Sequence, residues 1–169
     1  MEENKITLRP FRPEDQETIL EIVTSNKVNP TYMLPDFEKK EDAIPLFNRL
    51  MNLSQDPNRF VRCIAHDDSP VGFLNDVEVK DGCMELGYVI HPEHHNRGYM
   101  TQALKLAISE VFQRQFTSVI CGAFEHNKAS QRVMEKAGMQ LIGKTEDIEY
   151  RGKTHLCVFY EIRNEEQLC

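Results

Sequence analysis

The sequence lacks an apolar run long enough to cross a membrane as a helix. Such a helix needs about 20 consecutive apolar residues, and every apolar stretch in this chain of 169 residues is shorter. The first ten residues, MEENKITLRP, also lack the apolar segment of a secretory signal peptide. We therefore expect a cytoplasmic protein that does not engage a membrane.

Cysteine pairs with the spacing of a zinc site are also missing. The five cysteines are isolated from one another and include no CxxC pair, and four of them fall inside apolar, strand-like runs. Structural zinc sites need ligands at defined short spacings, whereas free cysteines commonly behave as small buried hydrophobic residues in a reducing compartment. The pattern favours buried thiols over a zinc centre.

Positive charge is scarce relative to negative charge. The chain has 20 Lys and Arg against 27 Asp and Glu, which gives a net charge of −7. Nucleic-acid binding depends on a basic face that neutralises phosphates, so we expect no nucleic-acid partner. An acidic surface is compatible with a cationic substrate such as an amine.

Internal repeats, low-complexity tracts and linkers are absent, so the length predicts one domain over residues 1–169. The hydrophobic periodicity and turn residues predict strands at 5–10, 59–66, 70–79, 83–90 and 116–124, helices from Pro13 and at 42–53, 99–114 and 127–138, and a final hairpin of 140–150 with 154–162. This β-α-α-β-β-β-α-β-α-β-β order indicates a mixed α/β protein, with a mostly antiparallel sheet of seven strands and four helices on both faces. Strands 83–90 and 116–124 should be parallel, because a helix joins them.

The stretch HPEHHNRGYM lies between a strand and a strongly amphipathic helix. A helix N-terminus presents unpaired N–H groups and a partial positive charge. Gly98 lets a ligand approach the backbone, and Arg97 adds a cation. Residues 95–100 therefore predict a pyrophosphate-binding loop, although no Gly-Lys-Ser/Thr of a Walker loop follows.

A metal site is the competing interpretation of the same stretch, because His91, His94 and His95 lie close together in the sequence. They occupy a loop with a proline and do not lie on one helix face. A closed metal site needs three or four converging ligands. We therefore favour solvated loop histidines and predict no metal.

The segment ELGYVIHPEHHNRGYMTQAL, followed by NKASQRVMEKAGMQLIG, resembles the GNAT superfamily of acyl-CoA-dependent N-acetyltransferases. It is most similar to the branch that contains the RimJ and RimL ribosomal-protein N-terminal acetyltransferases, with the same order of elements from Lys5 to Ile162. The resemblance implies a GNAT fold and an enzyme that uses acetyl-CoA to acetylate a primary amine. The acceptor would be a protein N-terminus, a polyamine or a small-molecule amine.

The family's phosphate-binding pattern, Q/R-x-x-G-x-G/A, falls on residues 95–100, where His95 and Met100 depart from it and Gly98 fits. The resemblance implies that acetyl-CoA contacts Val89, Ile90, His91, His95, Asn96, Arg97, Gly98, Tyr99, Met100, Thr101, Asn127 and Ser130. The first three would line the pantetheine arm, and the last two match the family's N-x-x-S motif. The structural alternative is that Asn127 only caps a helix and that Ser130 lies on its surface.

Amine acetylation needs a base, because an ordinary amine is protonated at neutral pH. Glu85 is the candidate, since its apolar strand MELGYVI should raise its pKa, and a Glu occupies this place in RimJ/RimL-like relatives. The alternative is a structural Glu that supports the sheet. Many family members use a Tyr as general acid where this chain has Met134, so Ser130 is the predicted substitute, by hydrogen bonding to the thiolate.

The acceptor is expected to meet the segment after the first helix and the last hairpin, which form the substrate walls in this family. The predicted substrate-binding residues are Tyr32, Phe37, Glu85 and Glu149. This acidic and aromatic region would favour a cationic amine, although general surface acidity also explains it. A non-catalytic acyl-CoA sensor with the same fold is the alternative function, and a homodimer is compatible with the sequence.

Overall fold

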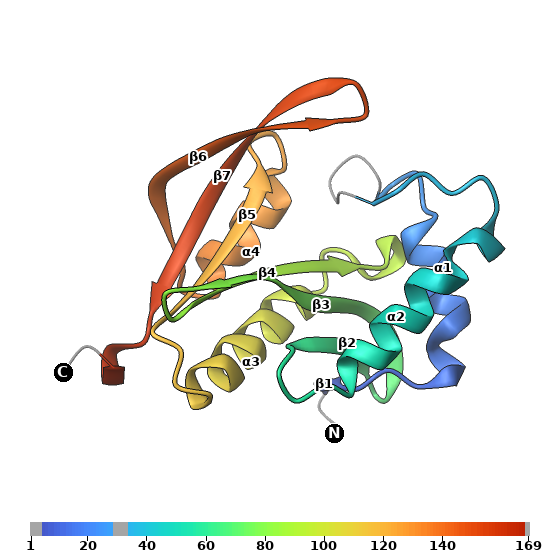
Figure 1. Ribbon diagram of the computed structural model, residues 1–169, viewed down its shortest axis with the longest axis horizontal. Helices are drawn as coiled ribbons and strands as arrows, with labels where there is room; N and C mark the ends of the chain where they lie inside the picture. Colours follow the sequence, from blue (N-terminus) through green and yellow to red (C-terminus); the bar gives the residue numbers. More distant parts are fainter. Residues whose placement is uncertain (1–4, 29–33, 168–169) are drawn as a thin grey trace. The chain divides into compact units, whose positions relative to one another are not determined.

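The computed structural model describes residues 5–28 and 34–167 (Figure 1). The predicted order of elements is confirmed, with these bounds: β1 Ile6–Arg9, α1 Gln16–Val23, α2 Ile44–Ser54, β2 Val61–His66, β3 Ser69–Lys80, β4 Cys83–Ile90, α3 Tyr99–Gln113, β5 Ser118–Phe124, α4 Lys128–Lys136, β6 Gln140–Tyr150 and β7 Lys153–Arg163. Short 3-10 helices cover Pro13–Asp15, Lys40–Ala43, Pro92–His94 and Glu165–Gln167. None of the helices in the described ranges is long and apolar enough to span a membrane.

The seven strands form one sheet in the order β1-β2-β3-β4-β5-β7-β6. Strands β4 and β5 are parallel, as the helix between them predicts, and the pairs β1–β2, β2–β3, β5–β7 and β6–β7 are antiparallel. The predicted mostly antiparallel sheet is therefore confirmed. Strand β5 starts two residues later than predicted, because Gln115 takes a left-handed φ of 71° and Thr117 donates its N–H to the Gly82 carbonyl.

Three two-residue turns connect neighbouring strands. Residues 67–68, 81–82 and 151–152 all have positive φ angles, between 48° and 77°. Positive φ at both central residues is the signature of type I′ turns, whose twist suits antiparallel hairpins. The turns fix which residues of β3 and β4, and of β6 and β7, lie beside each other.

The chain forms two compact units. The first unit consists of the segment that ends at Asn75 together with Tyr88–Ala103. The second unit consists of Asp76–Gly87 together with the segment that starts at Leu104. Strands β3 and β4 and helix α3 contribute residues to both units. The two units are described separately below.

The core of the first unit lies between helices α1 and α2 and one face of its strands. The ring of Phe11 packs edge-on against Phe47 of α2 and Phe73 of β3, with centroid distances of 6.1 and 6.2 Å. Cys63 of β2 is buried in the same cluster, and burial raises the pKa of its thiol to about 12. It behaves as the small apolar residue that the sequence predicted.

In the second unit, helix α4 packs against β5 and β7. Gly138 follows its C-terminus with a φ of 92° and donates its N–H to the Glu135 carbonyl, and Met139 donates to Met134. These two hydrogen bonds form a Schellman motif, which uses glycine at this position because left-handed backbone is costly for other residues. Gly138 thus ends α4 within the predicted helix range 127–138.

Candidate active site

In the first unit, the end of β4 leads through an irregular loop to the start of α3. The 3-10 helix Pro92–His94 comes first, and α3 begins at Tyr99. Asn96 and Gly98 have φ angles of 62° and 75° on either side of Arg97. Alternating backbone conformations of this kind can turn consecutive N–H groups toward an anion. Gln102 donates to the Gly98 carbonyl across 3.1 Å, so N–H groups before Gln102 precede the helix's own hydrogen-bond ladder.

The predicted loop residues fall into an exposed group and a buried group. His95, Asn96, Arg97 and Gly98 are exposed, whereas Tyr99 and Met100 are buried. The Tyr99 ring stacks on His66 at 4.6 Å, and its hydroxyl lies 3.4 Å from His66 Nε2. The side chains of Tyr99 and Met100 are therefore packed inside the first unit and do not face solvent.

His91 holds the end of β4 in place. Its backbone N–H donates to the Val71 carbonyl of β3 across 2.7 Å. Its Nδ1 accepts from the Glu93 N–H at 3.1 Å, and its Nε2 lies 3.4 Å from a carboxylate oxygen of Glu21. Because these groups are already engaged, His91 acts on the loop as an anchor between β3, β4 and α1.

The other two loop histidines have different neighbours. His95 Nε2 lies 3.1 Å from the Ile90 carbonyl, which can only accept, so His95 donates there. Burial, together with Arg97 and His91, lowers the pKa of His94. Within the described residues no group of three His, Cys, Asp or Glu side chains has the geometry of a metal site. The three histidines are thus individual parts of the loop.

Gly72 is a positioning residue that the sequence analysis missed. A Cβ atom at Gly72 would lie 2.3 Å from the Val89 carbonyl oxygen, which is far inside van der Waals contact. Only glycine allows β3 to approach Val89 this closely. A glycine inside the strand-like run PVGFLNDV was the available signal.

In the second unit, Glu85 lies at the end of the parallel ladder. The β4–β5 pairs run from Cys83 with Ser118 to Glu85 with Ile120. Glu85 is half-buried, and burial raises its pKa; Lys144 acts in the opposite direction, and Glu78 and Glu146 raise the pKa further. The direction of this shift agrees with the sequence-based expectation for a desolvated carboxyl group.

Next to Glu85, one face of the second unit's strands carries a small apolar cluster. Ile120, Cys157 and Phe159 are buried in it. Burial raises the pKa of the Cys157 thiol to about 11, and the Glu85 charge contributes to this. Lys144 places its Nζ 4.3 Å from the centre of the Phe159 ring. Neither Lys144 nor Phe159 was singled out from the sequence.

Asn127 and Ser130 meet at the start of α4. Asn127 is the N-cap residue, and its Oδ1 accepts from the Ser130 N–H at 3.2 Å. Asn127 therefore caps α4, which is compatible with both the capping alternative and the predicted cofactor contact, and Ser130 is half-buried. Met134 is fully buried, so it packs in the core where many family members place a catalytic Tyr.

Gln131 fixes the turn that carries Asn127, and the sequence analysis missed this role. Its Nε2 donates to the carbonyl of Glu125 at 2.8 Å and to that of Phe124 at 3.3 Å. The Tyr160 hydroxyl lies 3.4 Å from Gln131 Oε1 and 3.1 Å from Glu135 Oε1. A buried amide with partners on β5 and β7 holds the N-terminus of α4 in one orientation.

The residues predicted to bind the acceptor differ in location and burial. Tyr32 lies outside the described residues. Phe37 packs against the core of the first unit, and Glu149 is exposed on β6 opposite Thr154. The second unit instead gathers an aromatic group, in which the Phe124 and His155 rings stack at 4.6 Å.

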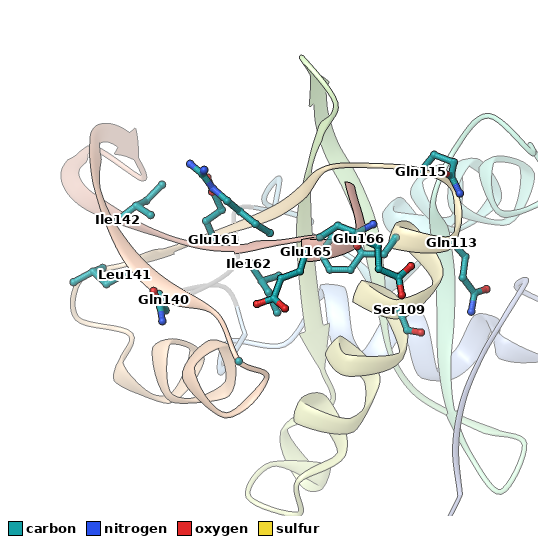
Figure 2. A pocket seen from close by; sticks show the side chains of 14 residues that line it. Ser109, Gln113, Gln115, Gln140, Leu141, Ile142, Glu161, Ile162, Glu165 and Glu166 are labelled. Carbon is teal, nitrogen blue, oxygen red and sulfur yellow. The ribbon is translucent and has the colours of Figure 1, made fainter. Parts of the chain in front are cut away.

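A surface hollow of about 1100 Å³ lies elsewhere in the second unit, beside the C-terminal part of α3 (Figure 2). Its lining includes Ser109, Gln113, Leu141, Glu165 and Glu166. Within the described part of the chain, no predicted site residue belongs to this lining. The size of a hollow alone therefore does not identify the candidate active site.

Comparisons with known proteins agree on one family. Residues 5–140 match the acetyltransferase (GNAT) domain. The uncharacterized N-acetyltransferase YoaA of Bacillus subtilis (strain 168) is 27% identical over 160 residues, which cover 91% of this chain and 90% of the relative.

Two solved structures share the fold. One is the acetyltransferase from Salmonella typhimurium that modifies the N-terminal serine of ribosomal protein L7/L12, with a TM-score of 0.81, 18% identity and coverage of 96% of this chain and 97% of that chain. The other is the spermidine N-acetyltransferase from Vibrio cholerae in complex with CoA and spermine, with a TM-score of 0.79, 16% identity and coverage of 97% and 98%. The predicted GNAT fold is confirmed.

Proposed function

The chain belongs to the acetyltransferase (GNAT) family, and we propose that its acceptor is a primary amine that is positively charged at neutral pH. As an enzyme of this family it is an acetyltransferase, and acetyl-CoA is the co-substrate that supplies the acetyl group. Two further carboxylates, Glu78 and Glu146, act electrostatically on Glu85. Their negative charges support a cationic acceptor.

The loop before α3 is the proposed binding site for the pyrophosphate of acetyl-CoA. The observation that carries this proposal is the exposed loop, in which Asn96 and Gly98 have positive φ angles immediately before a 15-residue helix. The N–H groups from Gly98 to Thr101 would donate to phosphate oxygens, and Arg97 would add its charge. Ile90 would pair with the pantetheine arm, since the N–H of the next residue already faces β3 and strand N–H groups alternate in direction.

The proposed chemistry uses two side chains of the second unit. Glu85 takes one proton from the ammonium group of the acceptor, directly or through water. The resulting neutral amine nitrogen attacks the thioester carbonyl carbon, the C–S bond breaks, and a second nitrogen proton passes to the departing thiolate. The departing thiolate accepts a hydrogen bond from the Ser130 hydroxyl. The raised pKa of Glu85 suits this role, because a base must hold a proton at a pH near that of the reaction.

The acceptor is best sought among amines of the kinds that structural relatives handle. One relative is named for acetylating a protein N-terminal serine, and another was solved with spermine. We propose a RimJ/RimL-like enzyme that acts on one of these two classes. The exposed acidic residues of β6, including Asp147 and Glu149, would attract such cations.

Two glycine substitutions test the loop. Gly98 and Gly152 have φ angles of 75° and 73°, and an added Cβ would meet nothing within 4 Å at either position. Gly98→Ala and Gly152→Ala therefore impose the same backbone strain of about 1 to 2 kcal/mol without a steric clash. We expect calorimetric titration to show an acetyl-CoA Kd about tenfold weaker for Gly98→Ala and unchanged for Gly152→Ala. Equal Kd values in both variants and the wild type would reject the loop as the binding site.

A non-catalytic acyl-CoA sensor is the second candidate function. It is favoured by the full burial of Met134 at the place where many relatives carry a catalytic Tyr. A panel of N-terminal peptides, polyamines and small amines, assayed by release of the CoA thiol, separates the two functions. A sensor binds acetyl-CoA and acetylates none of them, whereas the enzyme turns over at least one class.

We also propose that the two compact units form a single functional domain over residues 1–169 that works in the cytoplasm without nucleic acid or a membrane. The unpaired thiols of Cys63, Cys83, Cys121 and Cys157 support a reducing compartment. The net charge of −7 supports the absence of a nucleic-acid partner. Whether a homodimer forms can be measured by sedimentation.

A further inference from the structure

An irregularity in β6 directs the Lys144 side chain toward the ring of Phe159 on β7. The pairing of β6 with β7 shifts register between Leu141 and Thr145, so Lys144 lies in a bulged segment. Bulges re-aim side chains relative to a regular strand. The Lys144 ammonium lies over the ring of Phe159, with Nζ 4.3 Å from the ring centre.

Gly122 makes the Phe159 ring available as a platform. Gly122 of β5 pairs with Phe159 of β7. A Cβ atom at Gly122 would lie 2.8 Å from Cε1 of the ring and 3.1 Å from Cys157 Sγ. The ring therefore lies directly over the bare backbone of β5, and it is buried with the Lys144 ammonium over it. A cation over a ring face is attracted by the ring.

The charges around Glu85 come from several elements. Lys144 and Glu146 act from β6 and Glu78 acts from β3. The buried thiols of Cys121 on β5 and Cys157 on β7 also interact with Glu85 electrostatically. Lys144 is the cation among these groups, and only burial affects the Glu85 pKa more strongly.

Carboxylates beside an aromatic face are the elements that recognise an ammonium group. A cation on a ring face gains about 0.5 to 2 kcal/mol depending on how far it is desolvated, and nearby carboxylates add to this. Lys144 is exposed and sits on a flexible stem, so it can leave this position. An incoming primary ammonium has the same charge and the same three donors as the group that it would replace.

We propose that Lys144 is a positioning residue: its ammonium group is the counter-charge to Glu85 on this face of the second unit in the free enzyme, and it occupies the place that the ammonium group of the acceptor takes. The second part rests on the proposed function, because it assumes a cationic acceptor. The first part concerns the free protein alone. The two parts therefore have separate tests.

The first test measures the titration of the Glu85 carboxyl group by carbon-13 NMR in the protein without substrates, with Glu85→Gln used to assign the signal. Lys144→Met should raise the titration midpoint by about half a pH unit, as expected for loss of a partly exposed charge pair. Lys144→Arg should restore the wild-type midpoint. Lys153→Met, which removes an exposed lysine from the other strand of the same hairpin, should leave it unchanged.

The second test compares KM values at a pH where Glu85 is ionised in every variant. Lys144→Met should lower KM for the cationic amine that the panel identifies, by about threefold, and leave KM for acetyl-CoA unchanged. An unmoved Glu85 midpoint overturns the inference, whether or not any amine is acetylated. An amine KM that stays equal or rises would show that Lys144 and the acceptor do not share a position. A shifted midpoint in a protein that acetylates no amine would count against the proposed function alone.

Discussion

Asp15 in the first unit and Glu85 in the second are both carboxyl groups shielded from solvent, and their pKa values move in opposite directions. Burial raises the pKa of Asp15, but the hydrogen bonds from Arg9 and from the Arg12 N–H outweigh it, so the pKa is lowered. The Arg9 guanidinium donates to both Asp15 oxygens at 2.8 and 2.9 Å. For Glu85, burial and two neighbouring carboxylates outweigh one cation.

This difference separates a structural acid from a candidate catalytic one. A carboxylate with three donors remains charged and holds β1 to the chain segment before α1. A carboxyl group with a raised pKa can take up and release protons closer to neutral pH. Desolvation alone does not make an acid useful for catalysis; the donors that surround it decide which of the two roles it can have.

The largest expected effect comes from Glu85→Gln. Loss of a general base typically costs a factor of 10² to 10⁴ in rate, so we expect kcat to fall about a thousandfold. Because the deprotonated form is the base, the acid limb of the wild-type kcat/KM profile should disappear in the variant. Steady-state assays across pH with the best amine of the panel measure both changes.

Glu166→Gln is the matched control for charge removal, because Glu166 is exposed near the C-terminus. It should keep the wild-type pH profile. A Glu85→Gln enzyme with wild-type kcat and an intact acid limb would show that Glu85 has a structural role, as Asp15 does.

Breaking the ion pair of the first unit should affect stability. The side chains of Arg9 and Asp15 are 10% and 2% exposed, and removing one partner of a buried pair leaves an unpaired charge. We expect Arg9→Met to lower the free energy of unfolding by about 3 kcal/mol. Urea unfolding followed by far-UV circular dichroism measures this, since the chain has no tryptophan.

Arg12→Met supplies the control, because Arg12 pairs with Asp68 at the surface, where the side chains are 50% and 68% exposed. Exposed pairs contribute about 0.2 to 1 kcal/mol. Equal losses in the two variants would mean that the Arg9–Asp15 pair gains nothing from its burial.

Much of the fold could be predicted from the sequence, because local rules and tertiary packing agree there. The apolar stripe of α3, the turns at 67–68 and 81–82 and the stop at Gly138 each depend on a few neighbouring residues. The apolar strand around Glu85 also sufficed to predict the direction of its pKa shift. These features need no knowledge of which distant segments meet.

The features that were missed depend on contacts between distant segments. The position of Lys144 requires both the β6 bulge and the Phe159 ring above Gly122, which are set by the β5–β7 register. The bonds of His91 to Val71 and Glu21 likewise depend on strand β3 and helix α1. Periodicity within one element does not contain such information.

The pH dependence of stability should carry opposite signs for the two acids. The lowered pKa of Asp15 stabilises the fold above its ordinary value of 3.8, and this contribution is lost as the pH falls through the folded-state pKa. The raised pKa of Glu85 contributes stability below its ordinary value of 4.5, and this is lost as the pH rises through the folded-state pKa.

Urea unfolding from pH 3 to pH 8 therefore distinguishes the variants. Glu85→Gln should be more stable than the wild type at pH 8 and should converge with it at low pH. Asp15→Asn should be less stable at neutral pH, with the difference shrinking as the pH falls. Parallel curves for the two variants would contradict the opposite pKa shifts.

The smallest expected effect concerns Glu78, which acts on Glu85 from the neighbouring strand. Glu78→Gln removes a like charge, so the Glu85 carboxyl should titrate at a lower pH, opposite to the change expected for Lys144→Met. Because Glu78 is exposed, its charge is screened by solvent and salt. The Glu85 midpoint should therefore fall by about half a pH unit or less. On the acid limb this corresponds to a rise in kcat/KM of about threefold or less. The difference should shrink as ionic strength increases, whereas an effect of Glu78 on strand geometry would persist at high salt. A rise in the Glu85 midpoint would show that β3 acts on this acid through structure rather than charge.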